Sequence, residues 1–250
     1  MGEVSYLAYH VSLIELIALN NEVPGPVGIV YSTSPKTAIG IDGRTYYVKG
    51  RNDSIAFAEV CGCRLAAAVG LPAPEAHVGL FGEDWYAAVA EVEQKIQNVG
   101  PWLYSPAGIF NIEDLFGAIV VDCWLGNDDR NMGNLVGTPA GNRQIRLTMI
   151  DFEKSKTLGV NPTFQTANLN PIRLWPTGEL GARLRQIVPE RPPRRYLDSV
   201  RSVTANAVSE IVLAVVREVP VVTWGESSID VLVRRAQRIQ ILTEEIWPRN

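Results

Sequence analysis

The sequence predicts an α+β protein of two lobes, because strand-type and helix-type patterns occupy different halves of its 250 residues. The first half alternates short apolar runs with turn residues and holds one segment of helix length. The second half carries apolar residues at helical spacing, interrupted by one hairpin pattern. We place the boundary near residues 92–102, so that residues 1–95 form the first lobe and residues 96–250 the second.

The N-terminal lobe is expected to be an antiparallel sheet with one helix. Its strands are predicted at residues 28–31, 38–41, 44–49, 76–80 and 85–90. The dipeptide Asp42-Gly43 is a strong hairpin signal between two of these strands. Either Asp53 or Ser54 can cap the helix that follows, which is predicted over residues 55–69.

The C-terminal lobe is expected to be mostly helical. Helices are predicted at residues 110–125, 198–218 and 228–246, with a loop-rich stretch at 159–175. Residues 135–137 and 145–150 have the pattern of two strands joined by a turn at 138–142. A hairpin of this kind brings the residue before its first strand close to the residue after its second.

Asp129, Asn134 and Asp151 form the most informative pattern in the chain. Asp129 lies just past the predicted buried helix, Asn134 leads into the hairpin and Asp151 follows it. Phosphoryl transfer needs an acid to orient a hydroxyl proton, and an amide with a second acid to hold Mg²⁺ on the phosphates. Magnesium takes few protein ligands and shares its octahedron with phosphate and water. The set therefore predicts a magnesium-dependent phosphoryl-transfer site.

Each of these three residues taken alone also fits a polar loop, with capping side chains and a solvated acid after a strand. The order and spacing of the set favour the phosphoryl-transfer site. If the pattern is accidental, the chain is some other α+β enzyme.

Lys49 and Glu59 are the candidates for the phosphate side of the site. Lys49 ends a predicted strand, and a Lys in that place can hold nucleotide phosphates when a carboxylate keeps it in position. Glu59 lies on a strand-turn-helix path that can fold back over Lys49. Ser32 and Ser34 belong to a polar tip between two predicted strands, where hydroxyl and backbone N–H groups can cradle phosphate. The alternatives are a solvated Lys, a surface Glu and an ordinary hairpin tip.

Composition argues against several classes of protein. The net charge of −4 argues against a dedicated nucleic-acid surface. No stretch approaches the roughly 20 apolar residues of a membrane span, and the N-terminus lacks a signal-peptide pattern. Three cysteines, an odd and low count, suit a reducing cytoplasm, and with two histidines they do not support a zinc site. We therefore expect a cytoplasmic protein.

Four motifs together resemble the HipA-like kinases, in particular the short forms that consist of little more than the kinase core. They are YYVK at 46–49, the segment from AEV at 58–60 to GLPAPE at 70–75, WLGNDDRNMGNL at 124–135, and IDF at 150–152. The Asp-Arg-x-x-x-Asn element is the most specific of them. The resemblance covers roughly residues 25–160 and implies a bilobal protein-kinase-like fold, in the broad group that also holds the phosphatidylinositol 3/4-kinases.

The resemblance implies a role for each candidate residue. Lys49 would contact the α- and β-phosphates, and Glu59 would pair with it. Asp129 would be the catalytic base. Asn134 and Asp151 would bind Mg²⁺.

The resemblance also implies a nucleotide-covering loop and a hinge. Glu91, Val92 and Glu93 would form the hinge, whose backbone would read adenine. Ser32 and Ser34 lie where some family members carry phosphorylated serines.

Members of this family phosphorylate Ser or Thr on proteins, and some are toxins paired with an antitoxin. The resemblance thus implies ATP and Mg²⁺ as cofactors, a protein Ser/Thr acceptor that can be the chain itself, and an antitoxin-like partner. Two alternatives stay open: a nucleotide-binding toxin–antitoxin module without turnover, and a lipid or small-molecule kinase. No basic amphipathic helix supports membrane docking, which favours the protein acceptor.

Overall fold

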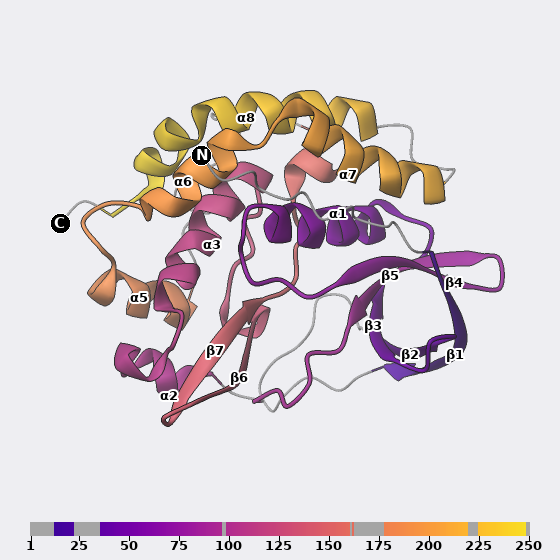
Figure 1. The fold of residues 1–250 in the computed structure, drawn as a ribbon, viewed down its shortest axis with the longest axis horizontal. Helices are drawn as coiled ribbons and strands as arrows, with labels where there is room; N and C mark the ends of the chain where they lie inside the picture. Colours follow the sequence, from indigo (N-terminus) through magenta and orange to yellow (C-terminus); the bar gives the residue numbers. More distant parts are fainter. Residues whose placement is uncertain are drawn as a thin grey trace.

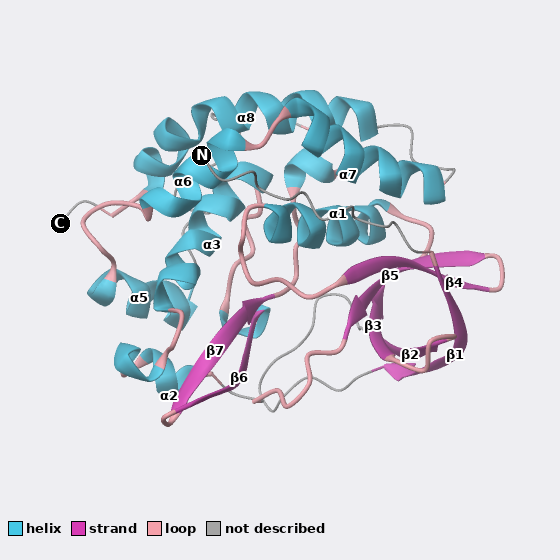
Figure 2. Cartoon of the chain, in the orientation of Figure 1, coloured by secondary structure: helices cyan, strands magenta, loops and turns pink. Residues whose placement is uncertain are grey.

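In a computed structural model of the chain, residues 13–22, 36–96, 99–160, 162, 178–219 and 225–248 are described. The strands of the first half form a closed barrel, and the helices of the second half gather on one side of it (Figures 1 and 2). The predicted strand at 28–31 and the tip with Ser32 and Ser34 lie outside the described residues.

The barrel has the strand order β1-β2-β3-β5-β4. Its strands are β1 (Ile14–Glu22), β2 (Lys36–Gly40), β3 (Thr45–Lys49), β4 (Ala76–Phe81) and β5 (Asp84–Ala90). The expectation of a purely antiparallel sheet is corrected here, because β1 pairs with β4 in parallel and so closes the barrel. The prediction lacked β1, in which exposed Ile17 follows buried Ile14 and Leu16, and exposed Leu13 directly precedes the strand. Apolar residues on both faces hide the period-2 pattern that identifies a half-buried strand.

Helix α1 (Ser54–Ala68) lies between the barrel and the C-terminal helices (Figure 1). The Asp53 carboxylate caps it by accepting hydrogen bonds from the N–H groups of Ile55 and Ala56. Most of the helix is buried on every side, because it packs on β4 and β5 and on α7 (Ala205–Glu218). A helix that is apolar all round belongs inside a protein. The predicted helix at 55–69 is confirmed.

The hairpin of the second half extends further than predicted. It consists of β6 (Leu135–Gly141) and β7 (Gln144–Met149). The chain reverses at Asn142 and Arg143, which both have positive φ angles of 48° and 60°. The turn expected at 138–142 was therefore placed too early, since Pro139 remains paired with Ile145. A two-stranded sheet consists of edge strands, and these tolerate a Pro.

Eight further segments complete the described chain. They are α2 (Gly100–Leu103), α3 (Ile112–Leu125), α5 (Gly178–Ile187), α6 (Arg194–Ser202), α8 (Gly225–Ile246) and three short 3-10 turns at Pro106–Gly108, Met132–Asn134 and Lys156–Leu158. The single helix expected over 198–218 is in fact two, α6 and α7. The break follows from Thr204, whose hydroxyl caps α7 by accepting from the N–H of Ala207. Short α2 begins within the lobe boundary expected near residues 92–102.

Helix α8 anchors α3 through the backbone at the end of α3. The Trp124 indole donates to the carbonyl oxygen of Leu232 at 2.9 Å. In return, the fully buried Arg235 donates to the carbonyl oxygens of Trp124 and Cys123. These bonds satisfy carbonyl groups that a helix C-terminus leaves without partners. They fix the end of α3, from which the candidate site begins.

No single helix among the described residues has the length and apolar composition to cross a membrane; α6 and α7 together meet that test only as a pair bent by 76°. All three cysteines are buried and free.

Candidate active site

The loop after α3 holds Asp129 by its backbone. Helix α3 ends at Gly126, which adopts a left-handed conformation with φ 66°. The Asp129 N–H then donates to the side chain of Asn127 at 3.4 Å. The Asp129 carbonyl oxygen accepts from the amide groups of Asn131 at 2.9 Å and Asn134 at 2.7 Å. These bonds fix the backbone of Asp129.

Burial raises the pKa of the Asp129 carboxyl group, and the nearby negative charge of Asp151 raises it further. A carboxylate whose pKa is raised in this way is a better proton acceptor than an ordinary Asp.

Asn134 and Asp151 flank the open end of the hairpin. Leu135 pairs with Met149 in the register of β6 and β7, and the N–H of Ile150 donates to the Asn134 carbonyl oxygen at 3.1 Å. The side-chain NH₂ group of Asn134 donates to the Asp129 carbonyl oxygen. The side-chain oxygen of Asn134 is therefore the atom suited to a metal. Sequence reasoning expected these two residues to be close, and the hairpin geometry brings them together.

Asp151 has a φ of 68°, in the left-handed region that residues with a side chain rarely adopt. Such backbone strain costs roughly 1–3 kcal/mol and persists only where the surroundings hold it. Here it turns the Asp151 carboxylate toward the barrel, where it meets the Lys49 ammonium at 2.6 Å.

Lys49 pairs with acids of the Asp151–Glu153 segment instead of forming the direct ion pair with Glu59 that was expected. Its ammonium lies 2.6 Å from Asp151 and 3.5 Å from Glu153. Glu59 acts at longer range: burial opposes the Lys49 charge, but Glu59, Asp151 and Glu153 outweigh burial and raise the Lys49 pKa. Burial also raises the pKa of Glu59.

Glu59 positions the backbone at Phe152 and does not contact Lys49 directly. Its carboxylate accepts a hydrogen bond from the N–H of Phe152 at 2.7 Å. The Phe152 side chain is fully buried and packs against α1 at Gly62, where an added Cβ would lie 2.4 Å from the Phe152 Cβ. Helix α1 thus fixes the segment that carries Asp151 and Glu153.

We predict that Gly62→Ala destabilises the protein although it adds a better helix former. Alanine gains up to about 1 kcal/mol of helix propensity over glycine. Overpacking against Phe152 costs roughly 1–3 kcal/mol, so the net change is a loss. Urea unfolding measures it, with Ala67→Gly at an exposed position of the same helix as the control for propensity. A Gly62→Ala protein more stable than wild type would show that Phe152 can move away.

Arg130 is the part of the site that sequence reasoning missed. Its guanidinium, 1% exposed, forms two hydrogen bonds of 2.8 Å with the buried carboxylate of Asp122 on α3. It also donates to the carbonyl oxygens of Asn134 at 3.1 Å and Ile150 at 2.6 Å, and it lies 5.0 Å over the Phe152 ring. One side chain therefore joins α3, the Asp129 loop and both ends of the hairpin.

Asp122 and Glu153 were also missed: Glu153 has no signal in the sequence beyond its charge, whereas the position of Asp122 offers one. Asp122 lies within an apolar helix pattern, where a lone acid predicts a buried partner. The oxygen atoms of Glu59, Asp151 and Glu153 lie within 4.8 Å of one another. This group has the chemistry of a cation site, and the Lys49 ammonium already lies in contact with two of its members.

The segment after β5 carries the predicted hinge residues. The Glu91 N–H donates to the Thr45 carbonyl oxygen at 3.1 Å, and the Glu91 carboxylate forms an ion pair with Lys95 at 2.7 Å. The Tyr47 hydroxyl donates to the same carboxylate at 3.3 Å. Val92, which is half-buried, and Glu93, which is exposed, follow in this segment.

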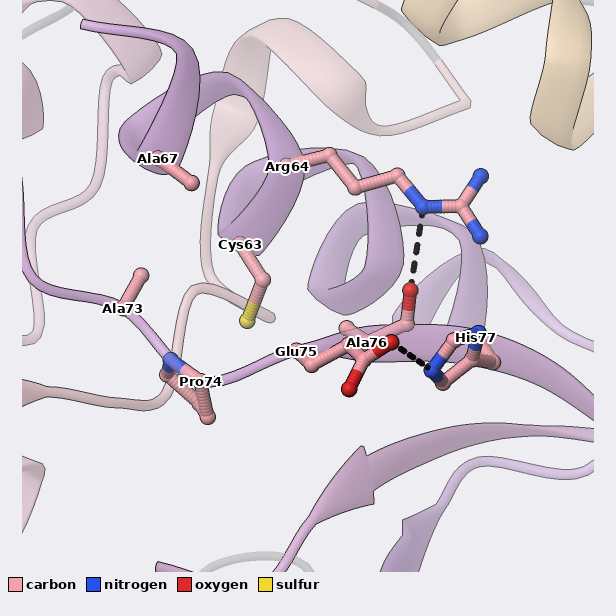
Figure 3. Close-up of a pocket in the computed structure, with 8 residues that line it drawn as sticks. All are labelled: Cys63, Arg64, Ala67, Ala73, Pro74, Glu75, Ala76 and His77. Atoms are coloured by element: carbon pink, nitrogen blue, oxygen red, sulfur yellow. Dashed lines mark hydrogen bonds and ion pairs between the residues drawn. The ribbon is translucent and has the colours of Figure 1, made fainter. Parts of the chain in front are cut away.

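A pocket of about 270 Å³ lies between α1 and the start of β4 (Figure 3). It is lined by Cys63, Arg64, Ala67 and residues 73–77. The Arg64 side chain donates to the Ala76 carbonyl oxygen at 3.0 Å. The pocket includes none of the candidate residues, so we assign it no part in the chemistry.

The fold is similar to those of solved kinases. The Helicobacter pylori proinflammatory kinase CtkA superposes with a TM-score of 0.58, over 94% of this chain and 99% of its own, at 12% sequence identity. HipA of Shewanella oneidensis MR-1, in a toxin–antitoxin complex with HipB and operator DNA, superposes with a TM-score of 0.51, over 90% of this chain and 67% of its own, also at 12% identity. No protein-family model and no curated protein matches the sequence. The chain has a HipA-like kinase fold.

Proposed function

We propose that the chain is an ATP- and Mg²⁺-dependent kinase that transfers the γ-phosphate to a Ser or Thr hydroxyl of a protein, which can be the chain itself. One observation carries the proposal. Lys49 of the barrel and Asp151 after the hairpin, 102 residues apart in sequence, meet at 2.6 Å. A kinase needs this combination of a cation for the phosphates beside an acid for the metal.

Lys49 would hold the α- and β-phosphates. Because Asp151 and Glu153 both contact its ammonium, Lys49 can exchange one acidic partner for phosphate oxygens and keep the other. Asn134 and Asp151 have the oxygen atoms that Mg²⁺ prefers. Bound there, Mg²⁺ would neutralise charge on the β- and γ-phosphates.

Asp129 would orient the acceptor hydroxyl and accept its proton. The acceptor oxygen then forms a bond to the γ-phosphorus while the bond to the leaving ADP oxygen breaks. The three backbone contacts of Asp129 from Asn127, Asn131 and Asn134 support this role, since catalysis by positioning requires a carboxylate on a rigid loop.

The hinge role is proposed for the backbone of Val92 and Glu93. The Glu91 N–H is already bonded within the barrel to Thr45, so it is not available to a base without loss of that bond. We place the nucleotide-binding lobe at residues 1–95 and the catalytic lobe at 96–250. Residue Ile96 supports this division, because its N–H bonds to Gly137 of the hairpin.

The acceptor and partner are proposed from the fold and from one neighbour. The solved HipA structure is a toxin–antitoxin complex with HipB and operator DNA. We propose a protein substrate with a Ser or Thr acceptor and an antitoxin-like partner for this chain. A net charge of −4 gives no reason to propose a dedicated nucleic-acid surface.

The proposal predicts that Asp151→Asn removes the magnesium-dependent part of ATP binding. Asn tolerates the left-handed φ of this position, so the backbone is preserved. For wild type, Mg-ATP at 100 times its Kd should stabilise the fold by about 2.7 kcal/mol, or roughly 5–10 °C in Tm. Thermal melts with ATP, with and without Mg²⁺, measure the difference.

Asp198→Asn is the control, because Asp198 is exposed on α6 and pairs only loosely with Arg194 at 3.4 Å. It should keep the wild-type response to Mg-ATP. The same rise in Tm for Asp151→Asn as for wild type would contradict the metal role, and no rise in wild type would contradict nucleotide binding itself.

A further inference from the structure

The chain that follows the hairpin runs antiparallel to the loop that carries Asp129. Ser155 pairs with Asn127 in an antiparallel bridge. In such a pairing the residue before Ser155 lies across from the residue after Asn127, so Lys154 lies opposite Asp128, the neighbour of the proposed base. Burial raises the pKa of Asp129 and the Lys154 charge opposes that rise, which agrees with the two side chains being near each other.

Glu153 connects Lys154 to Lys49. The Glu153 side chain is fully buried, and its two carboxylate oxygens face different lysines. One oxygen lies 3.5 Å from the Lys49 ammonium and the other lies 3.7 Å from the Lys154 ammonium. Lys49 comes from the barrel and Lys154 from the segment after the hairpin. The Lys154 ammonium thus belongs to the same polar group as the proposed phosphate-binding Lys49.

Lys154 differs from the other two cations of these segments in having N–H donors that are not already bonded. Arg130 is buried and donates to a carboxylate of α3 and to two carbonyl oxygens. The Lys156 ammonium is hydrogen-bonded to Asp128. Lys154 has no hydrogen bond to the residues that the structure describes, because its ion pair with Glu153 at 3.7 Å is too long for one. Its side chain is 40% exposed, so the ammonium can turn toward a ligand.

We propose that Lys154 is a further catalytic residue, which binds the γ-phosphate of ATP and stabilises the charge of the phosphoryl group during transfer. The inference rests on the proposed kinase function. That function assigns Lys49 to the α- and β-phosphates and Asp129 to the acceptor hydroxyl, so the γ-phosphate would lie between these two residues. The Lys154 ammonium is placed beside both.

The transferred phosphoryl group spreads negative charge over its oxygens, and a cation positioned at that charge lowers the barrier to transfer. The acceptor oxygen bonds to the γ-phosphorus while the bond to the ADP oxygen breaks. Lys154 keeps its proton throughout and forms no covalent bond. Its part is electrostatic, whereas Asp129 accepts the proton of the hydroxyl.

Comparing a triphosphate with a diphosphate tests this contact without relying on turnover. The probes are Mg-ADP and Mg-AMP-PNP, an ATP analogue that resists cleavage between its β- and γ-phosphates. Lys154→Met removes the charge, so AMP-PNP should bind about tenfold less tightly while ADP binds as it does to wild type. Isothermal titration calorimetry measures both affinities. In transfer from γ-labelled ATP, kcat should fall about 10²- to 10³-fold.

Lys156→Met is the matched control. It removes an equal charge two residues away, from an ammonium that is paired with Asp128. The ratio of its affinities for AMP-PNP and ADP should equal the wild-type ratio. The same change of ratio in Lys156→Met as in Lys154→Met would show that the net charge of the segment sets the ratio, and would overturn a specific contact of Lys154.

Unchanged AMP-PNP binding by Lys154→Met, or an equal loss of affinity for both nucleotides, would overturn the γ-phosphate contact and leave the kinase proposal standing. A changed ratio with an unchanged kcat would overturn the role of Lys154 in transfer. If wild type binds neither nucleotide, this proposal and the kinase proposal both fail.

Discussion

Asp129→Asn is expected to abolish phosphate transfer while leaving Mg-ATP binding intact. An amide cannot accept the hydroxyl proton, and the loss of a positioned general base costs about 10²- to 10⁴-fold in rate. The substitution keeps the size of the side chain, and the bonds that hold the Asp129 backbone come from Asn127, Asn131 and Asn134. The loop should therefore keep its shape. Transfer of label from γ-labelled ATP, with and without cell lysate, measures the effect.

Asp128→Asn is the matched control for this experiment. Asp128 is the neighbouring acid in the same loop, but its carboxylate forms an ion pair with Lys156, so we expect only a small change in rate. The labelled band in the wild-type reaction also shows whether the chain modifies itself or another protein. Equal labelling by wild type and Asp129→Asn would contradict the proposed base. If the wild type binds Mg-ATP but transfers no label, a nucleotide-binding module without turnover becomes the better description.

Much of the fold could be predicted where a segment carries its own signal. Asp53 and the apolar run after it identify α1, and the left-handed Gly126 ends α3 where the sequence suggested. Strand β1 and the α6–α7 break depend on tertiary packing or on a single capping residue such as Thr204. Neither leaves a strong periodic pattern, so both were missed.

The candidate site also has a part that the sequence predicts and a part that it does not. Asp129, Asn134 and Asp151 stand out because chemistry requires those residue types in that order, and the hairpin register fixes the last two. The acids in direct contact with Lys49 differ from the one predicted: Asp151, whose backbone is left-handed, and Glu153 contact the ammonium, whereas Glu59 acts on it at longer range. Sequence patterns do not encode a single strained dihedral angle, and they cannot distinguish Glu59 from Glu153 as the nearer acid.

Arg130→Met is expected to destabilise the whole protein by about 3–5 kcal/mol, because it leaves the Asp122 charge buried without its partner. Asp122 is 0% exposed and its two oxygens accept the two guanidinium bonds. The carbonyl oxygens of Asn134 and Ile150 lose a donor at the same time. Urea unfolding measures the loss, which corresponds to roughly 2–4 °C of Tm for each kcal/mol in a chain of this size.

Arg195→Met is the matched control, since its ion pair with Asp114 has the Arg side chain 54% exposed. Asp114 also keeps the hydrogen bond from the Tyr196 hydroxyl at 2.7 Å, so the expected loss is about 1 kcal/mol or less. A loss for Arg130→Met as small as this would mean that water reaches Asp122.

The double variant Arg130→Met with Asp122→Leu separates charge burial from positioning. Replacing both charges with apolar groups should recover much of the stability, because the unpaired charge is what costs most. Recovery should be incomplete, since the Asn127 side chain also donates to Asp122 at 2.9 Å. If the double variant folds but still fails to transfer phosphate, Arg130 acts by holding Asn134 and the Asp151 segment in register. Full activity in the double variant would instead limit Arg130 to stabilising the fold.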